Sequence, residues 1–151
     1  MLDEPTRRTA VMNAISTSGI NTSNPILPLM SLNPNRYGSI MLLLPYYDTP
    51  TTPPTAELRL THVRGLIYIP MSMKDFFNNA LGPASLKNER VNFTVAHIDP
   101  VSGAENVMYE RHEAKVDDNT MTKSQTMDVY GQKWKVTIYT LPQFLTFGDR
   151  Y

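Results

Sequence analysis

The strongest constraint on the fold is a stretch of regular alternation near the carboxyl end, residues 132–141. Apolar and polar side chains take turns along it: Trp134, Val136 and Ile138 against Lys133, Lys135 and Thr137. A pleated strand sends successive side chains to opposite faces, so this spelling predicts a strand with one buried and one solvated face. We therefore expect Trp134 in a core and the two lysines on the outside.

Length and composition limit the chain to one domain without strong charge. A chain of 151 residues fits a single domain with one core of ordinary size. Lys plus Arg and Asp plus Glu both number 14, so no net charge draws the protein to nucleic acid. Without cysteine there is no disulfide, no thiolate nucleophile and no cysteine-based metal site. Only 19% of the residues are charged, where about a quarter is usual, which favours a surface partly covered by other copies of the chain.

Residues 1–37 differ from the rest because Ser, Thr, Asn and Pro dominate them. Helical spacing occurs only in residues 8–15, where four apolar side chains share a face: Ala10, Val11, Ala14 and Ile15. Several prolines exclude a regular helix from residues 21–35. We predict that residues 1–37 form an extended arm and residues 38–151 a single β-rich domain, and a disordered tail is the alternative for the arm.

The arm is too apolar for a freely solvated linker. We expect it to lie along its own domain or along a neighbouring subunit. Its candidate subunit-contact residues are Ile26, Leu27, Leu29, Met30 and Leu32.

The first part of the domain mixes strands with one helix. Residues 39–47 predict a strand that is apolar on both faces, followed by a stiff, proline-rich loop. Residues 56–69 predict a second strand whose alternation slips near Gly65, where we expect a bulge. Residues 71–81 change to a helical period, with Ser72 as the cap and a Gly-Pro pair at the end.

From residue 90 onward the pattern is typical of hairpins. One hairpin turns at residues 99–103, and its register is expected to set Val95 opposite Val107, Phe93 opposite Tyr109 and His97 opposite Glu105. The other turns at Gly131, and its register sets Asp128 opposite Lys133, Met127 beside Trp134 and Gln125 beside Val136. Together the elements predict a mainly β fold, a β-sandwich or barrel-like antiparallel sheet with one short helix and an extended N-terminal arm.

No motif in the sequence indicates a catalytic or metal site. The histidines, His62, His97 and His112, lack the spacing that puts two ligands on one helical face. The serines lack a nucleophile-elbow frame, and the scattered glycines cannot form a phosphate-cradling loop. We therefore expect no catalytic residue, no metal and no cofactor, and we predict that the protein is not an enzyme.

Basic side chains supply a candidate outer basic face, made of Lys133, Lys135 and Arg59. Proteins that bind single-stranded nucleic acid need aromatic and basic groups on one face. Trp134 points away from its flanking lysines, so a nucleic-acid partner is not indicated. An acidic partner or peripheral contact with lipid head groups stays open for this face.

The arm, the low charge and the lack of an active site favour a self-assembling structural protein. In general character the chain is similar to small viral coat and matrix proteins. This similarity implies a homo-oligomer, contacts with other virion proteins, and a location in the virion or host cytoplasm. The arm carries few basic residues, so protein contacts are expected of it rather than genome packaging.

The alternative is a monomeric β-barrel or sandwich binding module for a small ligand or a partner protein. No signal peptide opens the sequence, so we expect the protein not to be secreted by that route. The most apolar run, residues 40–44, is too short for a transmembrane segment.

Overall fold

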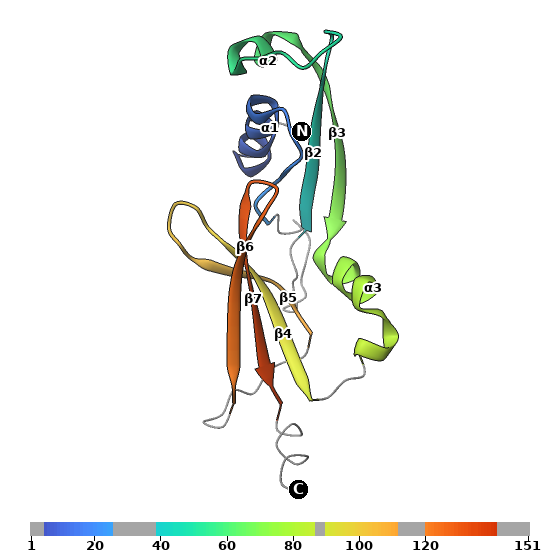
Figure 1. The fold of residues 1–151 in the computed structure, drawn as a ribbon, viewed down its shortest axis with the longest axis vertical. Coiled ribbons are helices and arrows are strands. Elements are labelled where there is room, and N and C mark those ends of the chain that lie inside the picture. Colours follow the sequence, from blue (N-terminus) through green and yellow to red (C-terminus); the bar gives the residue numbers. More distant parts are fainter. Residues whose placement is uncertain (1–4, 26–38, 87–89, 112–119, 142–151) are drawn as a thin grey trace, which may run out of the picture.

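The computed structural model describes residues 5–25, 39–86, 90–111 and 120–141. Two antiparallel sheets lie one above the other along the long axis of the molecule (Figure 1). The upper sheet has the strand order β1-β2-β3 and the lower sheet β5-β4-β7-β6. The predicted mainly β fold is confirmed.

The described residues form three helices and seven strands, where the sequence predicted one helix. In chain order they are α1 (Pro5–Thr17), β1 (Asn21–Thr22), β2 (Ser39–Tyr47), α2 (Ala56–His62), β3 (Val63–Ser72), α3 (Met73–Leu86), β4 (Val91–Ile98), β5 (Glu105–Glu110), β6 (Thr122–Val129) and β7 (Gln132–Thr140). In the described part of the chain, none of the helices has the length and apolar character that crossing a membrane requires.

The amino-terminal part contains a helix, and the prediction of an extended arm was wrong for residues 5–17. α1 buries the apolar stripe that the helical spacing predicted: Ala10, Val11, Ala14 and Ile15. This stripe packs on Met41 and Leu43 of β2, and burial on the sheet stabilises a helix of low intrinsic propensity. The predicted subunit-contact residues, Ile26, Leu27, Leu29, Met30 and Leu32, lie outside the described residues.

The upper sheet contains a bulge next to Gly65, as the slipped alternation predicted. β2 and β3 pair from Ser39 opposite Ser72 to Tyr46 opposite Gly65, and the next pair is Tyr47 with Val63. Arg64 is therefore the extra residue of the bulge. Because the bulge resets the alternation, Val63 and Leu66 both pack against the core beneath α1.

Residues 56–62 form α2 and not the first half of a strand, so this part of the prediction was wrong. The side chain of Thr55 caps the helix by accepting a hydrogen bond from the backbone N–H of Leu58. Glu57 in the first turn further favours the helix through its interaction with the helix dipole. The alternation of Leu58 and Leu60 imitated a strand, although both side chains are exposed.

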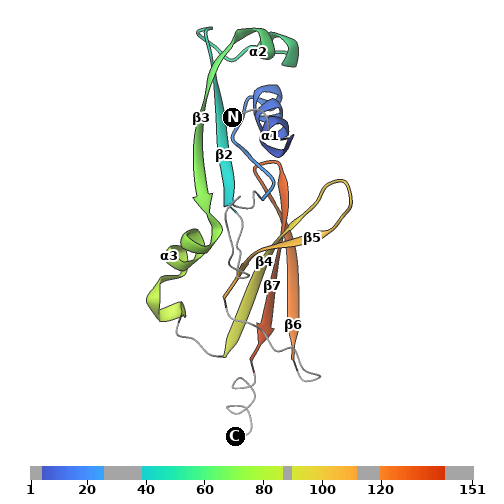
Figure 2. The ribbon, with the colours of Figure 1, turned by 180° about the vertical axis from the view of Figure 1, so that it is seen from behind.

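α3 connects the two sheets (Figure 2). Its predicted cap is confirmed, because Ser72 Oγ accepts the backbone N–H of Asp75 at 3.3 Å. Gly82, with a φ of 70°, interrupts the helix where the sequence predicted its end. The ring of Phe77 packs on Tyr109 of the lower sheet, with the ring centroids 4.9 Å apart.

The lower sheet confirms one predicted hairpin and corrects the other. In β6–β7, Met127 faces Trp134, Asp128 faces Lys133 and Gln125 faces Val136, as predicted. In β4–β5 the predicted register was wrong, because His97 faces Asn106 and Val95 faces Tyr109. The ladder shifts between Val95 and Ala96, and this irregularity lets the adjacent Met108 and Tyr109 both become buried.

A second core lies between β2, α3 and the lower sheet. Its buried residues are Ile40, Met73, Val95, Met108, Tyr109 and Trp134. Trp134 is only 7% exposed, so the prediction that it lies in a core is confirmed.

Replacing Trp134 by alanine tests this core. Trp134→Ala should lower the free energy of unfolding by about 3 to 5 kcal/mol, because it removes a large side chain from a packed site. Lys135→Ala on the opposite face should cost less than about 1 kcal/mol, since its ion pair with Glu105 is solvated. Urea melts of both variants measure the difference, and equal losses would contradict the assignment of the faces.

The loss of folding stability at alkaline pH tests the environment of Tyr109. Burial raises the pKa of this phenol above its ordinary value of 10.0, against the opposing effect of Arg111, and its hydroxyl donates to Asn78 at 2.8 Å. The raised folded pKa contributes stability below pH 10 that is lost as the pH rises through the folded pKa. In urea melts from about pH 8 to about pH 11, Tyr109→Phe should show a shallower alkaline loss than the unmodified protein. Parallel losses would show that Tyr109 is solvated.

Candidate functional site

An apolar cavity of about 410 Å³ lies between α1 and the first half of β3. Its lining consists of Val11 and Ile15 from α1 and of Val63, Arg64, Gly65, Leu66 and Tyr68 from β3. Small-molecule sites in proteins are commonly clefts of this size with mostly apolar walls and few polar groups. The cavity therefore has the dimensions and the lining of a ligand site.

Local sequence features place both walls of the cavity. Val11 and Ile15 are four residues apart, so they stand one above the other on the face of α1 that meets the sheet. Leu66 and Tyr68 are two residues apart on β3 and so share a face. The bulge at Arg64 brings Val63 to the same side as Leu66 and completes the wall.

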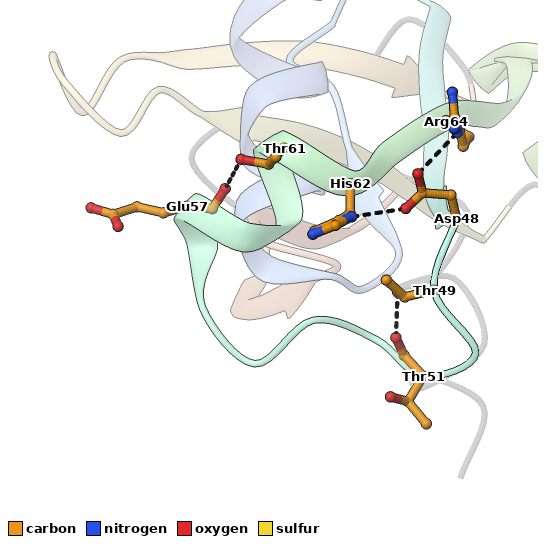
Figure 3. Close-up of polar contacts among 7 residues, drawn as sticks. All are labelled: Asp48, Thr49, Thr51, Glu57, Thr61, His62 and Arg64. Atoms are coloured by element: carbon orange, nitrogen blue, oxygen red, sulfur yellow. Dashed lines mark hydrogen bonds and ion pairs between the residues drawn. The ribbon is translucent and has the colours of Figure 1, made fainter.

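Two basic side chains share the carboxylate of Asp48 (Figure 3), and one of them, Arg64, lines the cavity. His62 Nδ1 is 2.9 Å from Asp48 Oδ1, and Arg64 Nε is 3.1 Å from Asp48 Oδ2. The backbone N–H of Asp48 also donates to the carbonyl of His62 at 3.0 Å. The ion pair with Asp48 favours this position of Arg64, whose side chain remains 68% exposed and can meet a ligand from solvent.

Hydrogen bonds within the adjoining turns support this cluster. The hydroxyl of Thr61 donates to the carbonyl of Glu57 at 3.0 Å inside α2, and that of Thr49 donates to the carbonyl of Thr51 at 2.7 Å (Figure 3). They order the chain on both sides of the site, since α2 ends at His62 and the turn follows Asp48.

Two tyrosines of β2 hold the helix and the bulge in place. The hydroxyl of Tyr47 donates to the carbonyl of Ile15 at 3.1 Å, which ties α1 to the sheet. Burial raises the pKa of Tyr47 above 10.0, against the opposing effect of Arg59, so this donor stays protonated at neutral pH. On the other face, the ring of Tyr46 lies so close over Gly65 that an added Cβ would be 2.6 Å from its hydroxyl.

The structure brings together two of the three residues of the candidate outer basic face. Lys133 Nζ lies 3.1 Å from Asp128 Oδ1, and Lys135 Nζ lies 2.6 Å from Glu105 Oε1, so both lysines are paired on one face of the lower sheet. Arg59 lies on α2 and donates to the backbone carbonyls of Pro53 and Pro54. None of the three lines the cavity. A role for these residues toward an acidic partner stays a prediction.

Sequence reasoning missed the cavity, although two of its signals were visible. These are the apolar stripe of α1 and the slip in alternation at Gly65. The sequence does not show that the apolar stripe of α1 and the strand around Gly65 lie opposite each other in the fold. In the described part of the chain, no group of three or more His, Asp or Glu side chains could hold a metal ion. The expectations that the protein is not an enzyme and needs no cofactor stay predictions.

Comparison with known protein families finds a match for the region that contains the cavity. A family model described as the CHASE domain matches residues 1–109. The matched range contains every residue that lines the cavity and the whole Asp48 cluster. No curated protein matches the chain significantly.

Proposed function

Because the chain belongs to the CHASE domain family, we propose that it is a sensory module that binds a small molecule between α1 and β3. CHASE domains are extracellular ligand-binding modules of receptors. The observation that carries the proposal is the apolar cavity of about 410 Å³, which is lined in part by Arg64, an exposed side chain paired with Asp48.

The family match overturns the prediction of a viral coat or matrix subunit. That prediction rested on the extended arm and on the lack of a recognisable site, and α1 replaces part of the arm. The alternative from the sequence, a module that binds a small ligand, agrees with the family. The predicted homo-oligomer stays a prediction.

The lining defines the chemistry of the ligand. Val11, Ile15 and Leu66 favour an apolar body, because each Å² of apolar surface removed from water contributes about 25 cal/mol. The guanidinium of Arg64 favours an acidic group, since charge-assisted hydrogen bonds to guanidinium are strong and directional. We therefore assign to the cavity an amphipathic ligand, an apolar ring or chain that carries one anionic group.

Asp48 prepares Arg64 for this role. The long side chain of an arginine loses rotamer entropy when a ligand fixes it, and a side chain that is already held loses less. The carboxylate holds only Nε of Arg64 in the observed ion pair. The terminal nitrogens of the guanidinium therefore remain to meet the anionic group of the ligand.

Ligand binding here stabilises the contact between α1 and the sheet. The same molecule would touch Val11 and Ile15 on the helix and Leu66 and Tyr68 on the strand. A ligand that binds only the packed arrangement favours that arrangement by mass action. A change in the packing of α1 is thus the simplest signal that this module can produce.

Two fluorescent probes of similar shape test the proposal. Anilinonaphthalene sulfonate has apolar rings and one anionic group, and N-phenylnaphthylamine is its neutral counterpart. Both should bind saturably. Arg64→Gln should weaken the sulfonate about tenfold, because one charged hydrogen bond is lost, and should leave the neutral probe unchanged.

Two further variants control the experiment. Leu66→Phe adds volume inside the cavity and should weaken both probes, whereas Arg8→Gln removes a charge from the exposed side of α1 and should change neither. Circular dichroism confirms that each variant is folded. Binding that is insensitive to Leu66→Phe would place the probes elsewhere and refute the site.

A further inference from the structure

A second cavity, of about 280 Å³, lies at the junction of the two layers. Three parts of the chain supply its walls: the first turn of α1, the segment after β1, and the β4–β5 hairpin. The lining residues are Thr6, Asn24, Pro25, His97, Asp99, Asn106 and Val107. It shares no lining residue with the cavity beside Arg64.

His97, which lines this cavity, has a buried imidazole whose Nδ1 has no hydrogen-bond partner in the part of the chain that the structure describes. His97 is 1% exposed, and its Nε2 lies 2.8 Å from Oε1 of Gln132. The amide nitrogen of Gln132 donates to the carbonyl of Thr22, so Oε1 accepts and His97 Nε2 carries the proton. Nδ1 is therefore an acceptor, and among the described residues it has no hydrogen-bond partner.

A carboxylate lies on the same side of the hairpin as His97. Asp99 follows two residues later, and its Oδ1 accepts the backbone N–H groups of Val101 and Ser102 at 2.9 and 2.8 Å. These hydrogen bonds lower the pKa of Asp99 below its ordinary value, so the group is charged at neutral pH. Neither Lys nor Arg belongs to the described lining.

A buried acceptor without a partner and a carboxylate in the lining of one cavity favour a ligand that donates hydrogen bonds and carries positive charge. We propose that this cavity is a second ligand site, which takes a small molecule with a primary ammonium group. The ammonium has three donors and so can serve both Nδ1 of His97 and the carboxylate of Asp99. The carbon body of the ligand lies against Pro25 and Val107.

The position of the site gives the ligand a structural effect. It touches Thr6 on α1, Asn24 and Pro25 beside the upper sheet, and the hairpin of the lower sheet. The two layers already meet here through His97, Gln132 and Thr22. A bound amine therefore contacts both layers near this junction.

Titration with n-butylammonium, followed by nitrogen NMR of protein labelled at histidine, tests the proposal. We expect a saturable shift of the His97 Nδ1 resonance, because a new donor approaches that nitrogen. Asp99→Asn retains an oxygen for the turn and removes the charge, and it should weaken binding about tenfold. Asp128→Asn, at the exposed end of β6, is the matched control and should leave the affinity unchanged.

The neutral probe n-butanol has a similar shape to n-butylammonium but no charge, so comparing the two shows whether binding depends on the charge. An equal shift with butanol would overturn the assignment of an ammonium group. The absence of a saturable shift with butylammonium, or equal weakening by Asp99→Asn and Asp128→Asn, would overturn the site. Since Asp99 is on the surface of a turn, its variant keeps the fold and each outcome can be read.

Discussion

The structure depends on β2, which serves two cores at once. Successive side chains of a strand point to opposite faces, so Ile40 enters the core of the lower layer while Met41 and Leu43 enter the core beneath α1. This explains why the strand is apolar on both faces. Most residues of the two cores come from segments far apart in the sequence, and β2 contributes to both. The relative position of the layers is thus fixed by one strand and reinforced by α3, which packs Phe77 on Tyr109.

A short polar joint completes the connection between the layers. The backbone N–H of Thr22 donates to the carbonyl of Tyr130 at 3.0 Å, and within the upper layer Ser23 exchanges hydrogen bonds with the backbone of Met41. Gln132 extends the joint from Thr22 to His97. Buried polar groups are costly unless they are paired, so these residues accept few alternative arrangements. α1 lines both cavities through different turns, and its packing is the feature that the two sites have in common.

Local signals in the sequence predicted local structure well, and failed where a distant contact decided the outcome. The register of β6–β7, the Ser72 cap and the buried face of α1 follow from neighbouring residues. The register of β4–β5 does not follow from neighbouring residues. Met108 is an extra residue in this ladder, and the shift lets both Met108 and Tyr109 be buried in the core that α3 covers. The alternation of Leu58 and Leu60 favoured a strand in the prediction. In the structure the cap at Thr55 stabilises the helix α2 instead. The cavity depends on the meeting of Val11 with Leu66, which no local pattern encodes.

The bulge at Arg64 links the fold to the proposed ligand site. In a regular strand Val63 and Leu66 would point to opposite faces, and the wall under α1 would lose one of them. With one extra residue both reach that wall, and Arg64 is left at the edge, where it meets Asp48. Gly65 makes this possible, because the close approach of the Tyr46 ring leaves no room for a side chain beside the bulge. The irregularity visible in the sequence at Gly65 was therefore the best local pointer to the site.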